Sequence, residues 1–129
     1  MVKQFSYVVV GNGIAGITAV ETLRAEDDAA DIAVVADTTL PLYNRPLLKD
    51  FLAGRVSEDK LWMRPESFYR DQLVHFLSGR VTGIEVDQHA IHLQNGEQIG
   101  YHRLLLATGA RARQLSCPCL LYTSDAADE

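Results

Sequence analysis

Cysteines, long apolar runs and surplus basic residues are all scarce in this sequence. Its 129 residues include two cysteines, Cys117 and Cys119, which are too few for a disulfide framework or a complete zinc site. No apolar run approaches the roughly 20 residues that a membrane-spanning helix needs. The net charge of −5 leaves no cationic excess to neutralise nucleic-acid phosphates or anionic lipids. These absences argue against a disulfide-stabilised protein, a membrane partner and a nucleic-acid partner.

The remaining composition is that of an ordinary globular domain. Hydrophobic residues make up 47% of the chain and charged residues 22%, and the length predicts a single domain. The N-terminal apolar run before the first glycine is too short for a secretory signal. The sequence therefore predicts a cytoplasmic protein.

A glycine-rich turn separates a predicted strand from a predicted helix near the N-terminus. Tyr7–Val10 is long enough for one buried strand, and apolar residues recur at helical spacing over Ile14–Arg24, with Glu21 and Arg24 on the exposed side. Between them, Gly11 to Gly16 reads Gly-x-Gly-x-x-Gly. A strand, this turn and a helix in that order form the context that the dinucleotide-binding motif requires. The alternative is an ordinary β–α turn that binds nothing.

Each glycine of the motif has its own expected role. Gly11 would form the tight turn, Gly13 would let the backbone approach a pyrophosphate, and Gly16 would let the helix pack closely on the strand. The helix would direct its positive end and its free amides, including those of Ile14 and Ala15, at the phosphates. This turn is therefore the predicted phosphate-binding site.

An acidic residue follows the second predicted strand. Ile32–Ala36 predicts another buried strand, which completes a parallel β–α–β unit of about 30 residues. Asp37 ends this strand 21 residues after Gly16, where such motifs commonly place an acid that binds an adenosine ribose hydroxyl. A turn-forming aspartate is the alternative. We expect the ribose-binding role because the spacing matches the motif.

The second half of the sequence predicts a β-meander rather than further β–α units. The expected meander strands lie at residues 81–86, 89–94 and 97–101, after a strand at 74–77 and short helices at 47–52 and 66–72. Asn95-Gly96 is a strong hairpin-turn signal between the last two meander strands. His89 and His92 are three apart on a strand and would point to opposite faces, so no metal site is predicted.

A last predicted strand ends in a loop of small residues. Arg103–Leu106 predicts a buried strand, which runs into Ala107-Thr108-Gly109. Small residues at the carboxyl end of a strand suit the close approach of a ligand in this architecture. Because this loop follows a glycine motif and a meander, it is a specific indication of a ligand-binding loop.

Together these motifs resemble the N-terminal FAD-binding segment of the FAD- and NAD(P)H-dependent pyridine nucleotide oxidoreductases. The resemblance is carried by the glycine turn, Asp37, Tyr43–Pro46, the meander and Leu104–Arg111. Within this family the sequence most resembles three subgroups. They are the rubredoxin reductases, the flavin part of assimilatory nitrite reductases, and the ferredoxin reductases of oxygenase systems. The resemblance implies an α/β, Rossmann-like FAD/NAD(P)-binding domain, with a parallel sheet and a β-meander. It also implies that NAD(P)H reduces FAD, which reduces an acceptor of the rubredoxin, ferredoxin or sirohaem/iron–sulfur type.

The resemblance also implies roles for single residues, though none is identified as catalytic. The three glycines would hold the FAD pyrophosphate, and Asp37 would hold the adenosine ribose. Arg45 and Lys49 would line the flavin site, in a segment one residue shorter than the Arg-Pro-Pro-Leu-Ser-Lys of ferredoxin reductases. The backbone near Val81 would meet the adenine. The small-residue loop would close over the cofactor through Ala107, Thr108 and Gly109.

The resemblance leaves the expected domain incomplete. The family requires a second glycine motif for NAD(P)H, a returning FAD segment and a C-terminal domain, and none of these is recognised in the sequence. Residues 1–118 are therefore expected to be the N-terminal part of an FAD-binding domain. Residues 119–129 match the translation of a sequencing adapter and are expected to be an artefact. The chain alone is expected to bind FAD weakly and to be inactive with NAD(P)H.

Two other functions stay open on the sequence alone. One is a Rossmann dehydrogenase with NAD as its only cofactor, and the other is a non-catalytic nucleotide-binding module. A dehydrogenase would share the glycine motif, but its sheet would continue with β–α units where this chain has a meander. No cysteine lies between Gly16 and Arg111. This absence excludes the subgroups that need a thiolate beside the flavin and leaves direct transfer from flavin to acceptor.

Overall fold

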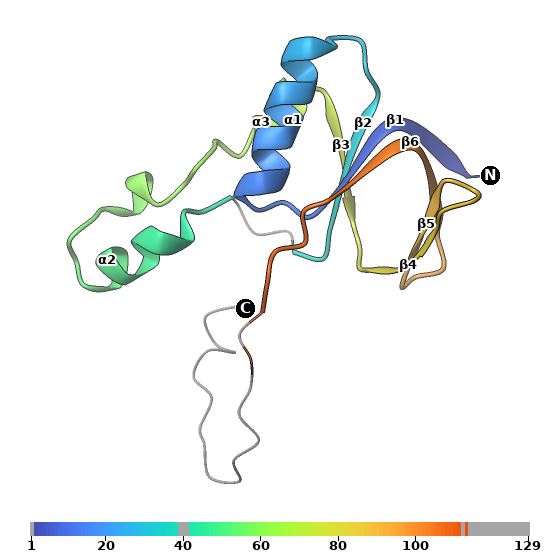
Figure 1. Cartoon of the computed structure of the whole chain (residues 1–129). Coiled ribbons are helices and arrows are strands. Elements are labelled where there is room, and N and C mark those ends of the chain that lie inside the picture. Colours follow the sequence, from blue (N-terminus) through green and yellow to red (C-terminus); the bar gives the residue numbers. More distant parts are fainter. Residues whose placement is uncertain (1, 39–41, 112, 114–129) are drawn as a thin grey trace, which may run out of the picture.

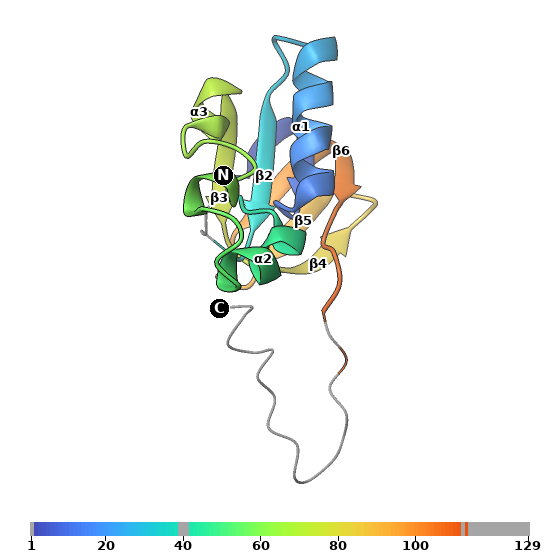
Figure 2. The same cartoon turned by 90° about the vertical axis from the view of Figure 1, so that its left-hand side faces the viewer.

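The computed structural model describes residues 2–38, 42–111 and 113. These residues form a six-stranded mixed sheet with α1 packed on one face (Figures 1 and 2). The strands are β1 (Lys3–Val10), β2 (Ile32–Ala36), β3 (Val74–Ser78), β4 (Val81–Glu85), β5 (Ala90–Leu93) and β6 (Gln98–Leu106). The α-helices are α1 (Ile14–Glu26), α2 (Leu48–Leu52) and α3 (Phe68–Asp71), with 3-10 turns at Arg45–Leu47 and Glu58–Lys60. Both cysteines and the segment 119–129 lie outside the described residues.

The elements β1, α1 and β2 form the parallel β–α–β unit that the sequence predicts. β1 and β2 pair in parallel, with Val8 opposite Ala33. β1 begins at Lys3 rather than at Tyr7, because its first residues pair with the start of β6. A strand pairing across so much intervening sequence leaves no local pattern, which is why the predicted strand begins too late.

The sheet combines a parallel part and an antiparallel part. Its strand order is β3-β2-β1-β6-β5-β4. β3, β2, β1 and β6 run parallel, whereas β4, β5 and β6 form the predicted antiparallel meander. β6 therefore belongs to both parts. This arrangement confirms the α/β fold class predicted from the sequence.

β6 corrects two of the sequence-based expectations. The sequence predicts separate strands at 97–101 and 103–106, but the structure has one continuous strand. Its end is not buried either, since Leu105 and Leu106 are 41% and 55% exposed. β5 pairs with β6 only over Gln98–Gly100, so in the described part of the chain the rest of β6 has β1 as its one neighbour. A largely apolar hollow of about 400 Å³ lies beside it, between α1 and β6.

Buried side chains cover both faces of β1. Val9 packs with Ile17 and Val20 of α1 on one face of the sheet. Val8 and Val10 belong to the other apolar layer, which includes residues of the meander. Alternate residues of β1 thus face two layers, as expected for a central strand of a parallel sheet. This packing fixes the start of α1 close to the end of β1.

Arg24 holds the C-terminal end of α1 to the segment that precedes β3. Its guanidinium donates hydrogen bonds of 2.8–3.3 Å to five backbone carbonyls, those of Asp27, Asp28, Ala30, Gln72 and Leu73. The sequence places Arg24 on the exposed side of the helix, whereas the structure makes it a half-buried contact. Arginine suits this position because its fork presents five donors.

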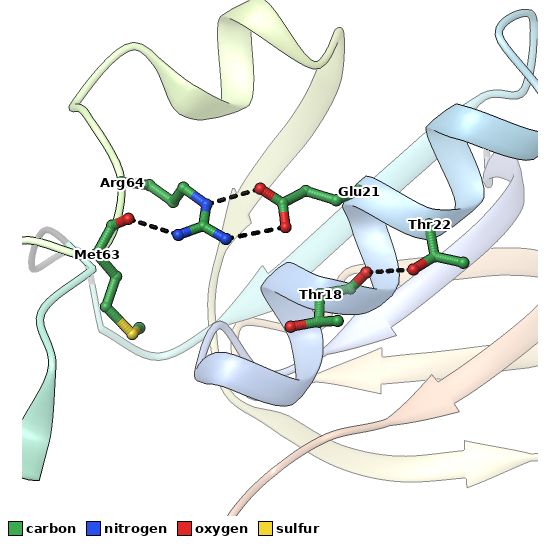
Figure 3. Close-up of polar contacts among 5 residues, drawn as sticks. All are labelled: Thr18, Glu21, Thr22, Met63 and Arg64. Carbon is green, nitrogen blue, oxygen red and sulfur yellow. Dashed lines mark hydrogen bonds and ion pairs between the residues drawn. The ribbon is translucent and has the colours of Figure 1, made fainter.

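Glu21 is likewise a structural contact rather than a solvated side chain. Arg64 donates from Nε and Nη2 to the two carboxylate oxygens of Glu21, at 2.6 and 3.0 Å (Figure 3). Arg64 Nη1 also donates to the carbonyl of Met63 at 2.6 Å. The hydrogen bond from Arg64 lowers the pKa of Glu21 below its usual 4.5, although burial acts in the opposite direction. The pair ties the segment between α2 and α3 to α1.

Acid should therefore weaken the fold through Glu21. Because the pKa of Glu21 is lowered in the folded chain, the pair adds stability above about pH 4.5, and this stability is lost as the pH falls through the lowered value. We expect Glu21→Gln to reduce the urea midpoint at neutral pH and to flatten its decline in acid. Glu66→Gln, which removes an exposed carboxylate, is the control. An unchanged pH dependence in Glu21→Gln would contradict this role.

Candidate functional site

The loops that follow the parallel strands meet at one edge of the sheet. The N–H of Gly11 donates to the carbonyl of Val35 at 2.8 Å, which ties the glycine turn to β2. On the other side, the N–H of Ala107 donates to the carbonyl of Val10 at 2.7 Å. Since β1 lies between β2 and β6, the glycine turn is flanked by the loops after both neighbours.

Two glycines of the motif are required by packing within the chain. Gly11 has a φ of +109°, and a Cβ there would overlap the carbonyl of Ala107. A Cβ on Gly16 would overlap the carbonyl of Gly11. The small-residue loop therefore touches the glycine turn through Ala107, while Thr108 and Gly109 are exposed beyond it. These contacts agree with the predicted tight turn and close helix packing.

Gly13 is different, because nothing within the described chain requires a glycine there. Its φ is −76°, and a Cβ would meet no atom within 4 Å. Gly13 is the N-cap of α1, without a side-chain capping bond, and the first turn holds no acidic residue. The amides of Ile14 and Ala15 thus have no partner within the helix, because its first amides lie ahead of the hydrogen-bond ladder. Open space, free donors and the positive helix end together suit an anionic group.

Asp37 lies beside this turn. It follows β2 directly and is exposed. The side-chain amide of Asn12 donates to the carbonyl of Thr38 at 3.3 Å, which joins the loop after β2 to the glycine turn. An Asp37 carboxylate oxygen lies 3.6 Å from Nη2 of Arg111. The predicted ribose-binding acid is therefore near the predicted phosphate site, and its ligand stays a prediction.

The other predicted residues lie on neighbouring segments. The N–H of Gly79 donates to the carbonyl of Ala36 at 2.8 Å, which brings the turn before Val81 to the end of β2. Val81 itself is half-buried against the core of the meander. Arg45 and Lys49 are exposed, on the 3-10 turn before α2 and on α2. Figures 1 and 2 place α2 beyond the N-terminal end of α1. Their cofactor contacts stay predictions.

Sequence reasoning missed two side chains near the turn. Arg111 reaches Asp37 from the loop after β6. Tyr69 of α3 lies near Asn12, and burial raises the pKa of its hydroxyl while the Asn12 side chain acts in the opposite direction. Arg111 ends a segment that carries the resemblance, but the sequence gives it no role, and Tyr69 has no local signal at all. Only the fold brings Arg111 to Asp37 and Tyr69 to Asn12.

Other chemistry-bearing side chains serve contacts away from the turn. His92 lies 3.1 Å from a carboxylate oxygen of Glu85, and His89 stacks on Tyr101 just before β5 begins. The sequence predicts that His89 lies on a strand, but in the structure it comes just before β5. Over the described ranges, no group of three His, Cys, Asp or Glu residues could hold a metal ion. Within those same ranges, no helix has the length and apolar character of a membrane span.

Comparison with known proteins finds consistent relatives. Residues 5–127 match the pyridine nucleotide-disulphide oxidoreductase family. Putidaredoxin reductase CamA of Pseudomonas putida is 38% identical over 110 residues, which cover 84% of this chain and 26% of that protein. The rubredoxin-NAD(+) reductase of Pseudomonas putida is 35% identical over 112 residues, which cover 85% and 29%.

A solved structure shares the fold. A chain of the covalent putidaredoxin reductase–putidaredoxin complex matches with a TM-score of 0.81 and 35% identity. The match covers 87% of this chain and 27% of the other. This chain therefore spans about a quarter of the length of the curated relatives described above.

Substitutions at Gly13 and Gly16, at the start of α1, should change the thermal stability of the chain in opposite directions. Gly13→Ser adds atoms in open space, and serine is a favoured N-cap, so we expect equal or higher thermal stability. Gly16→Ala should lower the melting temperature, although alanine is the better helix former by about 1 kcal/mol, because its Cβ would overlap the Gly11 carbonyl. Thermal unfolding followed by circular dichroism measures the melting temperature of both variants. A Gly16→Ala chain as stable as the wild type would contradict this packing.

Proposed function

Because the chain belongs to the pyridine nucleotide-disulphide oxidoreductase family, we propose that its glycine turn binds FAD in an NAD(P)H-dependent electron-transfer enzyme. When bound, FAD would accept a hydride from NAD(P)H and release electrons to an acceptor. The described residues would supply part of the FAD site, and none of them is assigned a catalytic role. We place the reaction in the cytoplasm, as the sequence predicts.

The observation that supports this proposal best is the open space at Gly13. Gly11 and Gly16 have packing partners within the chain, but Gly13 has none within 4 Å of its Cβ position. A glycine that the chain does not need suits a ligand that must approach the backbone closely. The pyrophosphate of FAD would accept hydrogen bonds from the amides of Ile14 and Ala15 at the positive end of α1.

The remaining roles depend on where the residues lie. Asp37 would accept hydrogen bonds from the adenosine ribose hydroxyls, and the backbone at Val81 would border the adenine. Arg45 and Lys49 would line the flavin from the side of α2. Ala107, Thr108 and Gly109 would cover the cofactor from the loop after β6.

The proposed acceptor is a small electron-transfer protein of the rubredoxin or ferredoxin type. Relatives at 35–38% identity are named for putidaredoxin and for rubredoxin. The chain has no cysteine between Gly16 and Arg111, so a thiol relay from these residues is absent and transfer would be direct. A sirohaem or iron–sulfur centre is the other acceptor that the sequence predicts.

A dehydrogenase with NAD as its only cofactor is the competing function. Both functions use the glycine turn, and they differ in the elements that come after β3. Here the chain continues into the meander of β4, β5 and β6 rather than into further parallel β–α units. This topology supports FAD as the ligand of the first glycine motif.

Titration with FAD tests the proposal. We expect the purified chain to quench FAD fluorescence weakly, to bind NAD⁺ less well, and to oxidise no NADH or NADPH. Gly13→Ser should weaken FAD binding about tenfold or more by displacing phosphate from charge-assisted hydrogen bonds, with no loss of stability.

Gly83→Ser is the matched control, because a Cβ there makes only ordinary contacts of 3.8–4.0 Å with His92 on the meander. It should bind FAD like the wild type. NAD⁺ binding in preference to FAD would favour the dehydrogenase. NADH turnover by the purified chain, or unchanged FAD binding in Gly13→Ser, would contradict the proposal.

A further inference from the structure

An ion pair links the two loops that flank the glycine turn. Nη2 of Arg111 lies 3.6 Å from Oδ2 of Asp37. Asp37 follows β2 and Arg111 lies beyond the end of β6, and β1 separates these two strands in the sheet. The pair therefore spans the end of β1, where the chain turns at Gly11.

Two contacts bring this pair close to the proposed phosphate site. On the Asp37 side, Asn12 of the glycine turn donates to the carbonyl of Thr38 at 3.3 Å. On the other side, the backbone of Ala107 packs against Gly11 with no room for a Cβ. The two residues of the pair therefore follow segments that both contact the glycine turn, and the guanidinium of Arg111 lies beside Asp37.

The pair is exposed enough to exchange partners. The side chains of Arg111 and Asp37 are 75% and 51% exposed. Ion pairs this exposed add little to stability, so a ligand that supplies new partners can replace the pair at little cost. Ribose hydroxyls would supply hydrogen-bond donors to Asp37, which would release Arg111.

A dinucleotide also brings negative charge that needs a cation. Its pyrophosphate would lie close to the carboxylate of Asp37, and the first turn of α1 holds no charged side chain. Arginine is suited to the task because its planar fork matches phosphate oxygens. Arg111 is the cation that the structure already holds beside Asp37.

We propose that Arg111 is a phosphate-binding residue of the dinucleotide site, which pairs with Asp37 until ribose hydroxyls take that carboxylate. This inference rests on the proposed function. It gives the loop after β6 a charged contact with the ligand, in addition to the proposed contacts of Ala107, Thr108 and Gly109. It also gives Asp37 a counter-ion that limits its repulsion of the incoming phosphates.

Calorimetric titration with adenosine, ADP and FAD separates the ribose contact from the phosphate contact. We expect Arg111→Gln to weaken ADP and FAD binding about fivefold, the loss of one exposed charge-assisted contact, and to leave adenosine binding unchanged or tighter. Arg111→Lys should recover part of the affinity for ADP. Arg113→Gln, the same charge change at an exposed position on the same segment, should bind all three ligands like the wild type.

Each other outcome has a definite meaning. Equal losses in Arg111→Gln and Arg113→Gln would overturn the inference in favour of a general charge effect. Tighter binding of all three ligands by Arg111→Gln would overturn it too, because Arg111 would then only compete for Asp37. Unchanged ADP binding in Arg111→Gln overturns this inference alone. A wild-type chain that binds neither FAD nor ADP overturns the proposed function as well.

Discussion

The close contact of three backbone segments at Gly11 is the constraint on which the rest of the structure depends. The carbonyl of Ala107 occupies the space of a Cβ on Gly11, and the carbonyl of Gly11 occupies that of a Cβ on Gly16. The end of β1 is thereby packed between the loop after β6 and the first turn of α1. A side chain at either glycine would push these segments apart. The direction of the helix, and hence of its free amides, depends on this contact.

The same contact explains how one short motif can serve both the folding of the chain and the proposed binding. Gly11 and Gly16 serve the packing of the chain, whereas Gly13 faces open space, where we propose that the ligand binds. Asp37 and Arg111 flank the turn from β2 and from the loop after β6, because the strand order puts β1 between them. Charge, free amides and open space therefore meet at a single edge of the sheet.

Local signals in the sequence predict the central part of this arrangement well. The strand, glycine turn and helix, the second strand and the hairpin at Asn95-Gly96 each depend on residues close together in the chain, and all are found in the structure. The contacts of Arg24 and Arg111 and the continuity of β6 depend instead on residues far apart in sequence. The prediction that Leu105 and Leu106 are buried is wrong. Burial of an apolar strand also depends on distant segments that pack against it, and the strand's own residues do not indicate which segments these are.

The central claim is that the first turn of α1 binds the phosphates of FAD. Amide chemical shifts of the ¹⁵N-labelled chain during an FAD titration test this claim most directly. We expect the largest changes at Gly13, Ile14 and Ala15, smaller ones at Asp37, and little change in the β4–β5 hairpin. Changes concentrated around the apolar hollow between α1 and β6, with the amides of the first turn unmoved, would contradict it.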